Sequence, residues 1–251
     1  ADERHLSIYM RDPQLAQTLA KNGWDGSLPQ APPGDFLMAV DTNMGYNKAN
    51  VYIERDLAYS VILGPQPEGL LSVTYQHTGP QKSDPCYQGV DDEFEEAAEY
   101  LAIADQCYWN YLRVYAPAGS SLLDSSRHIV PGATLYSEVT WASNALTVED
   151  IPWLTTFANF LLVPRGEVVT AFLKYQLPPG VMTVLDSGES VYQLTLQKQP
   201  GMKSESVAVT ITLPDNATLI EAHPAPTRVE GTQLAFEVEF VADQILTVRF
   251  R

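Results

Sequence analysis

A strict alternation of apolar and polar residues over short segments constrains the fold of this chain more than any other feature. Between Val169 and Leu177 every second residue is apolar, and polar residues such as Thr170 and Lys174 lie between them. This period of two predicts a strand with one buried face. Further segments rich in β-branched or aromatic residues and bounded by turn residues are 35–40, 50–63, 70–79, 110–117, 134–143, 157–164, 191–199, 206–214, 217–222, 233–241 and 245–250.

The order of these segments predicts a mainly β fold. Short strands that follow one another without helical crossovers are typical of antiparallel sandwiches. We expect two immunoglobulin-like β-sandwiches, with a boundary near Pro179 and Gly180. The expected units are a helical segment with a proline-rich connector at 1–33, a larger sandwich at 34–180 and a smaller one at 181–251.

The first residues predict a short helix in "RDPQLAQTLAKNGWDG". Asp12 can cap its start and Pro13 suits the first helical position. Leu15 and Leu19 would lie on one face, and Asn22-Gly23 would end the helix.

Two cysteines, Cys86 and Cys107, enclose an acidic insert. They are too few for a zinc site, because the four histidines are scattered along the chain. We favour a disulfide that closes the insert, which would contribute about 3 kcal/mol and would indicate an oxidising compartment. A pair of buried free thiols is the alternative.

A second short helix is expected inside this insert, in "VDDEFEEAAEYLAIAD". Phe94 and Leu101 have helical spacing, and acidic residues occupy its first turn. The acidic run is most simply a solvated helix face, with weak calcium binding as the alternative. We expect no other cofactor and no metal site.

The formal net charge of -16 argues against nucleic acids and anionic lipid surfaces as partners. Such a field repels nucleic-acid backbones and anionic headgroups. No apolar run is long enough to span a bilayer, so we expect no membrane contact by this part of the chain. The first residues lack signal-peptide features, which predicts either a cytosolic protein or a targeting segment further upstream.

The stretch "DTNMGYNKAN" is the strongest candidate for a polar site. It does not match a calcium loop or a phosphate loop. We interpret it as a connection between strands in which Asp41 and Asn43 bond local backbone amides and Gly45 takes a positive φ. Lys48 would be solvated or paired with an acid, and Asn47 belongs to the same loop.

No catalytic nucleophile stands out. "DSGES" lacks the flanking pattern of a nucleophile elbow, and nothing selects a Ser-His-Asp triad. We expect His77 and His128 to be ordinary surface or boundary residues.

Aromatic residues offer one alternative function. Trp24, Trp109, Trp141 and Trp153 could stack on sugars if two or three of them lined one exposed face. Large aromatic side chains more often fill a core, and we expect this at least for Trp109.

Four stretches together resemble one bacterial family, catalogued as domain of unknown function 4012. They are "NGWDG", "GDFLMAVDTNMGYNKANVYIERDLAYSV", "CYWNYLRVYAPAGSSLL" and "LLVPRGEVVTAFLKYQLP". The resemblance covers 12–178, and only general β-sandwich character continues after it. Asp41, Asn43, Asn47 and Lys48 lie in a stretch that looks like a family element, but no family site residue can be carried over.

The resemblance implies an envelope protein with an upstream membrane anchor and a long extracytoplasmic region. We therefore expect a non-catalytic module that acts as a stalk or as a protein-interaction surface. The alternatives are a module that binds carbohydrate or cell-wall polymer, and an accessory part of an envelope-polymer enzyme whose catalytic domain lies upstream. The expected partner is a protein or a cell-wall glycan.

Overall fold

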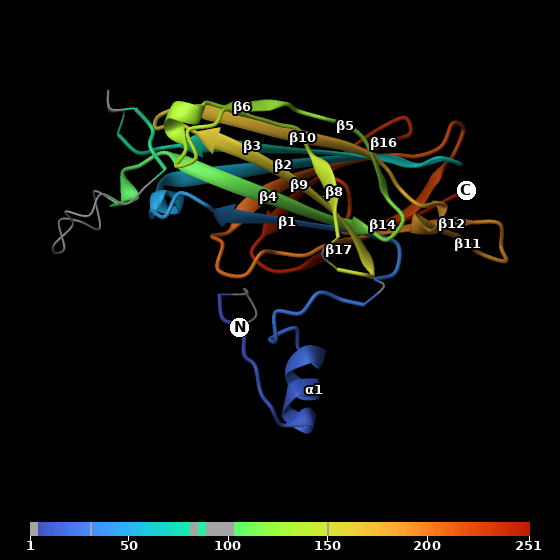
Figure 1. Cartoon of the computed structure of the whole chain (residues 1–251). Coiled ribbons are helices and arrows are strands. Elements are labelled where there is room, and N and C mark those ends of the chain that lie inside the picture. Colours follow the sequence, from blue (N-terminus) through green and yellow to red (C-terminus); the bar gives the residue numbers. More distant parts are fainter. Residues whose placement is uncertain (1–4, 31, 81–84, 89–102, 150) are drawn as a thin grey trace.

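Strands dominate the fold, as the alternation predicted, and they form two facing sheets (Figure 1). The computed structural model describes residues 5–30, 32–80, 85–88, 103–149 and 151–251. Helical elements are α1 (Pro13–Lys21) and the short 3₁₀ helices η1 (Ala49–Tyr52), η2 (Gly132–Thr134) and η3 (Pro179–Val181). The strands are β1 (Asp35–Asn43), β2 (Ile53–Ile62), β3 (Glu68–His77), β4 (Tyr108–Pro117), β5 (Ser121–Ser125), β6 (His128–Val130), β7 (Trp141–Ser143), β8 (Leu146–Val148), β9 (Leu154–Val163), β10 (Val168–Gln176), β11 (Met182–Val184), β12 (Ser190–Leu196), β13 (Glu205–Thr212), β14 (Leu219–His223), β15 (Arg228–Glu230), β16 (Gln233–Phe240) and β17 (Gln244–Phe250).

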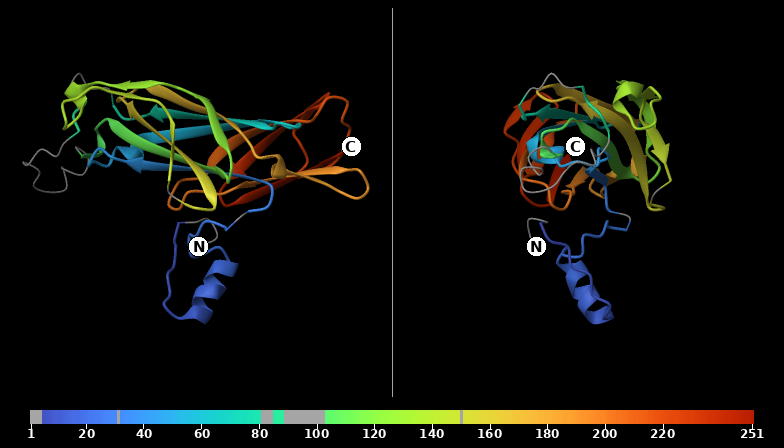
Figure 2. Two further views of the ribbon diagram at one scale, coloured as in Figure 1. Left: turned by 45° about the vertical axis from the view of Figure 1, so that its right-hand side comes forward. Right: turned by 60° about the vertical axis from the view of Figure 1, so that its left-hand side comes forward.

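The first sheet has the order β14-β17-β12-β1-β4-β9-β8, and β11 pairs with the beginning of β12. The second sheet has the order β15-β16-β13-β2-β3-β10-β5, while β6 and β7 form a separate ribbon. Figure 2 shows the sheets from the side and from close to the strand direction. The sandwich is longer along its strands than across them.

Two parallel strand pairs join the early and the late parts of the chain, and we call this junction the seam. In the first sheet β1 pairs with β12 only over Asp35–Leu37. In the second sheet β2 pairs with β13 over Leu57–Ile62. The late strands are therefore staggered along the sandwich, and β12 extends beyond the beginning of β1.

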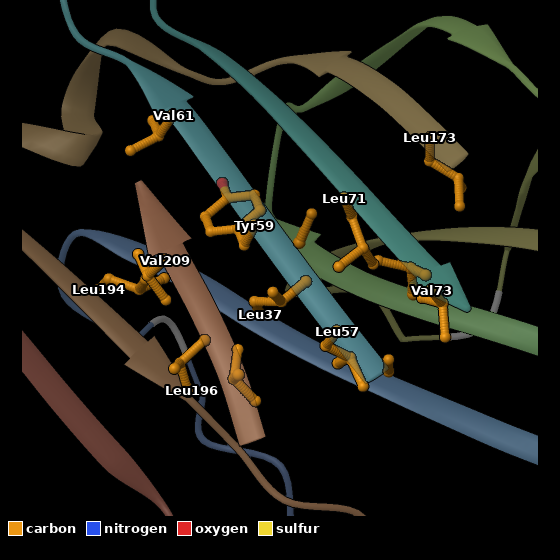
Figure 3. Packing of buried hydrophobic residues seen from close by; sticks show 14 of the residues in the cluster. Leu37, Leu57, Tyr59, Val61, Leu71, Val73, Leu173, Leu194, Leu196 and Val209 are labelled. Carbon is orange, nitrogen blue, oxygen red and sulfur yellow. The ribbon is translucent and has the colours of Figure 1, made fainter. Parts of the chain in front are cut away.

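One hydrophobic core lies between the sheets and continues across the seam. Leu37 and Tyr59 from the early strands belong to the same buried cluster as Leu194 and Val209 from the late strands (Figure 3). Because both parts of the chain share the sheets and the core, the expected pair of separate immunoglobulin-like sandwiches is not confirmed. Alternation reports which face of a strand is buried, but not which distant strand lies beside it.

The burial pattern follows the alternation in the inner strands of the second sheet, such as β10, and departs from it in the centre of the first sheet. Ala171, Leu173, Tyr175 and Leu177 are all buried, as predicted. In contrast, every residue of 36–39 is buried. The reason is that the outer face of β1, β4 and β9 is also covered.

Two small hydrophobic clusters provide this cover. The first joins Trp109 and Phe160 to Val130 beside the β6–β7 ribbon. The second packs Leu28 of the N-terminal connector against the cluster of Phe36, Met38, Tyr115 and Leu154. The connector is further held by a hydrogen bond from Gln197 Nε2 to the carbonyl oxygen of residue 27, at 3.0 Å.

The segment 134–143 differs from its predicted strand, since only Trp141–Ser143 is extended in a ladder. The chain folds back before this point, and the backbone N–H of Gly132 donates to Thr140 Oγ1 at 3.0 Å. A Cβ atom on Gly132 would lie 2.3 Å from the carbonyl oxygen of Glu138, so the close return requires glycine here.

Helix α1 is confirmed with the signals that predicted it. Asp12 Oδ1 accepts hydrogen bonds from the backbone N–H groups of Gln14 and Leu15, each at 3.0 Å. Gly23 follows the helix with a φ of 66°. No residue of α1 is buried, and the helix stands away from the sheets (Figure 1).

The helix predicted in the acidic insert falls mainly on 89–102, outside the described residues. Among the residues described, none of the helices is long and apolar enough to cross a membrane.

Gly34 provides a test of the seam. Its φ is +75°, and a Cβ atom would lie 2.4 Å from the carbonyl oxygen of Gln193 on β12. Gly188 has a φ of +78° and open space around it. Gly188→Ala should therefore cost only the left-handed conformation, about 1–2 kcal/mol, whereas Gly34→Ala should cost roughly 1–3 kcal/mol more because β12 must move.

Urea unfolding of both variants measures this difference. Equal losses of unfolding free energy in Gly34→Ala and Gly188→Ala would contradict the close contact between the beginning of β1 and β12.

Candidate functional site

The loop that follows β1 is held by its own two asparagines. Asn43 Nδ2 donates to Asn47 Oδ1 at 2.9 Å, and Asn43 Oδ1 accepts from the backbone N–H of Gly45 at 2.9 Å. Asn47 Oδ1 also accepts from the backbone N–H of Ala49, and Asn47 Nδ2 donates to the carbonyl oxygen of Cys107, both at 3.0 Å. These contacts fix the loop against the beginning of β4.

One expectation about the backbone of this loop was wrong. Tyr46, rather than Gly45, takes the positive φ, at 54°. Glycine is needed at 45 for close packing instead, because a Cβ atom there would lie 2.8 Å from the ring of Trp109. Lys48 is exposed, and its backbone N–H donates to the carbonyl oxygen of Ile103 at 3.1 Å.

Asp41 was also expected to bond local amides, but its side chain turns into the sandwich. Asp41 Oδ1 accepts from Tyr75 Oη and from Asn110 Nδ2, each at 2.6 Å. Asp41 Oδ2 accepts from Arg55 Nη1 at 2.6 Å. Asp41 is thus separated from Asn43, Asn47 and Lys48, and belongs to a different cluster.

Arg55 lies at the centre of this cluster. Its Nε and Nη2 donate to the two carboxylate oxygens of Glu205, at 2.9 and 2.5 Å. We call Asp41, Arg55 and Glu205 the ion triad. The side chains of its members are only 5%, 2% and 6% exposed, so solvent screens these ion pairs weakly.

The charges of the triad shift the pKa values of Arg55 itself and of two neighbouring tyrosines. Burial alone lowers the pKa of Arg55, but the charges of Asp41 and Glu205 outweigh this effect and raise the pKa above its ordinary value. Burial, together with the negative charge of Asp41, raises the pKa values of Tyr75 and Tyr108. Arg55 therefore stays charged, and both phenols stay neutral, across the physiological pH range.

The crossover 197–204 between β12 and β13 completes the cluster. Asp41 lies beyond the last residue of β1 that β12 reaches. In place of a strand, the Gln199 side chain accepts from the backbone N–H of Asp41 at 2.8 Å and donates to its carbonyl oxygen at 3.0 Å.

The sequence contained one overlooked signal for the triad. Asp41, Arg55 and Glu205 each fall two residues from an inward apolar position: Ala39, Leu57 and Val207. A charged residue at an inward position of a strand requires a buried partner. This reasoning could have selected the three residues, although not their pairing.

A second buried carboxyl group lies at the other end of the β1 contact with β12. Asp35 is fully buried, and its Oδ2 accepts from Tyr59 Oη at 2.7 Å and from Tyr192 Oη at 2.6 Å. Burial raises the pKa of Asp35 to about 6, and the hydrogen bonds from the two tyrosines limit the rise.

The predicted disulfide is confirmed between Cys86 and Cys107. Such bonds persist in oxidising compartments, so it indicates a location outside the cytoplasm. Next to it, Gln88 Nε2 donates to the carbonyl oxygen of Met44 at 2.7 Å, and the backbone N–H of Gln88 donates to the carbonyl oxygen of Thr134 at 2.8 Å. The loop after β1, the cysteine segment and the 132–140 turn therefore meet at one end of the sandwich.

Aromatic and histidine side chains are divided between the core and the surface. Trp109 is fully buried, as expected, while Trp141 and Trp153 are 47% and 36% exposed. His77 was expected near the surface but is buried, with its Nε2 2.8 Å from the carbonyl oxygen of Gln106. His128 is half-buried, and burial lowers the pKa values of both histidines.

Within the described part of the chain, no group of three or more His, Cys, Asp or Glu residues could hold a metal ion. The acidic run considered for calcium lies outside the described residues.

Comparisons with known proteins leave the family open. No protein-family model and no curated protein matches the chain. Among solved structures, it is similar to a Legionella pneumophila protein proposed to bind nutrients, with a TM-score of 0.40, 7% identity, and coverage of 86% of this chain and 72% of that one.

Two enzyme structures are also similar. For the M1 zinc metallopeptidase of Deinococcus radiodurans the TM-score is 0.34 and the identity 13%, with coverage of 78% of this chain and 42% of the other. For leukotriene A4 hydrolase of Saccharomyces cerevisiae the TM-score is 0.39 and the identity 6%, with coverage of 83% and 31%. This chain therefore spans less than half of either enzyme.

Removal of the central charge tests the ion triad. Arg55→Met leaves two buried carboxylates without their partner and should cost about 3–5 kcal/mol of unfolding free energy. Arg228→Met is the matched control, because it breaks an exposed pair with Glu230 and should cost about 0–1 kcal/mol. Urea unfolding at neutral pH compares them, and equal losses would show that the triad has no structural role.

Asp35 should give the chain a distinct pH dependence. The folded state holds the Asp35 proton more tightly than the unfolded state, since the pKa rises from 3.8 to about 6. Its stabilising contribution is therefore complete below pH 3.8 and is lost as the pH rises through about 6. As the pH rises through this window, the unfolding free energy of the wild type should fall by about 3 kcal/mol relative to that of Asp35→Asn.

Chemical denaturation of both proteins between acidic and neutral pH measures this shift. A difference that does not change with pH would mean that Asp35 titrates like an exposed carboxyl group.

Proposed function

We propose that this chain is a non-catalytic extracytoplasmic module of a bacterial cell-envelope protein, which serves as a rigid spacer and presents a protein-interaction surface at one end. The resemblance to the uncharacterised envelope family and the Cys86–Cys107 disulfide support this location. The length of the sandwich along its strands supports the role of a spacer (Figure 2).

The observation that carries the proposal is a group of exposed tyrosines at the end of the sandwich where β1 finishes. Tyr46, Tyr87 and Tyr136 are 74%, 53% and 78% exposed, and we call them the tyrosine end. Gln88 and the disulfide tie together the three backbone segments that carry them. The end is therefore held in place before any partner binds.

Tyrosine suits a contact surface for physical reasons. It supplies a large contact area with few rotatable bonds, and its hydroxyl group remains hydrogen-bonded as the ring is buried. Tyrosine and tryptophan are enriched at the points of protein interfaces that contribute most binding energy. A firmly held backbone adds to affinity, because less conformational entropy is lost on binding.

Carbohydrate binding is the second candidate, and one observation favours it. The Trp141 ring stacks on Phe160 with ring centroids 4.8 Å apart, yet it remains 47% exposed. A half-exposed ring supported from behind can accept a sugar on its free face.

One set of variants tests both candidates. The double variant Tyr46→Ala, Tyr136→Ala should lose a partner that crosslinks to the wild-type chain in envelope extracts. Tyr9→Ala, at an 83% exposed tyrosine near α1, should retain it. Sedimentation with purified cell wall examines the alternative, since Trp141→Ala should abolish glycan binding and leave the protein partner unaffected.

Retention of the partner by the double variant would contradict the interaction surface. Turnover of an envelope polymer by the wild-type chain alone would contradict the non-catalytic role.

A further inference from the structure

The stagger at the seam leaves a hollow above the ion triad. β12 stops beside Leu37, and the ladder between β13 and β2 begins at Leu57. Within the described residues, the last part of β1 is therefore paired only with β4, and the first part of β2 only with β3, so both are open on the side of the late strands. The crossover 197–204 closes this gap only in part. A hollow of about 450 Å³ remains, which is within the range of small-molecule sites.

The floor of this seam hollow carries a net negative charge. Asp41, Arg55, Glu205 and Tyr108 all line it, and all are buried. The two carboxylates and one guanidinium of the triad sum to one negative charge. A buried charge that is not balanced is costly, so the floor favours a cation in the hollow.

The carboxylate of Glu205 also has room for another donor. Each of its oxygens accepts one hydrogen bond from Arg55, although a carboxylate offers about four acceptor positions. Arg55 cannot act as an acceptor and Asp41 already accepts three side-chain donors. Glu205 is thus the group in the floor that is best able to receive a new N–H donor.

The walls determine what else the ligand must contain. Val51, Ile53 and Met202 line the hollow beside the floor, and Glu54 and Lys203 lie exposed among its polar lining residues. Apolar walls over an anionic floor suit a cationic head on an aliphatic body. We propose that the seam hollow binds a primary ammonium group carried on a short aliphatic chain.

Other ligand classes fit less well. The floor offers two carboxylates that are both engaged by Arg55, which is a poor donor set for a metal ion. An anion would meet the net negative charge of the floor. A neutral alcohol of the same length would leave that charge unbalanced.

Calorimetric titration of the chain with pentylamine and with pentanol tests the proposal directly. Pentylamine should bind saturably, and pentanol should bind at least about tenfold more weakly. Glu205→Gln makes the triad neutral and should weaken pentylamine binding by a similar factor. Glu237→Gln is the matched control, because this exposed residue lines only the neighbouring hollows and its loss changes the total charge equally.

A second variant separates a lost site from a damaged fold. Val51→Trp keeps the ion triad intact and fills the hollow from its partly exposed wall. Urea unfolding should show wild-type stability for this variant, while pentylamine binding is lost. If Val51→Trp binds pentylamine as tightly as wild type does, the ligand lies elsewhere and the proposal is wrong.

The source of the ammonium group is resolved by a third ligand, N-acetyl-lysine amide. Binding as tight as that of pentylamine indicates a lysine-like side chain of a peptide, and much weaker binding indicates a free amine. Absence of binding by either amine, or equal binding by pentanol, would overturn the proposal. This site is independent of the tyrosine end, so the titration and the crosslinking experiment can fail separately.

Discussion

The ion pair between Asp41 and Arg55 crosses from one sheet to the other, and the arrangement of the seam depends on it. Arg55 on β2 also binds Glu205 on β13, so one guanidinium joins three strands from both parts of the chain. A buried ion triad adds little net stability compared with apolar residues of the same volume. We expect it instead to select one register, because a slip of β13 by one residue would turn Glu205 outward and leave Arg55 short of a partner.

The seam thus combines two kinds of polar contact. Near the beginning of β1, Asp35 accepts hydrogen bonds from the hydroxyl groups of Tyr59 and Tyr192, and no cation among the described residues forms an ion pair with it. Near the end of β1, Asp41 is balanced by Arg55. The first group responds to moderate acidity because burial dominates its pKa. The second keeps its guanidinium charged, because the coulombic attraction of two carboxylates exceeds the cost of burial.

The sequence predicts those features that depend on neighbouring residues. Asp12 and Pro13 locate α1, alternation around Tyr175 identifies the inward face of β10, and the two cysteines locate the disulfide. It does not predict that β12 and β13 join β1 and β2, since parallel pairing over such a separation leaves no local pattern. The same limit explains the site. Asp41 was found because its loop is conspicuous, but its partners come from strands far along the chain.

The side chain of Gln199 limits how another chain can add a strand to this sandwich. Its amide satisfies the backbone N–H and carbonyl of Asp41 at a point where β12 no longer pairs with β1. An open strand edge is a template on which another chain can add a strand, and such additions lead to aggregation. A single side chain thereby blocks this edge against pairing, at a position where the chain would otherwise be prone to polymerise.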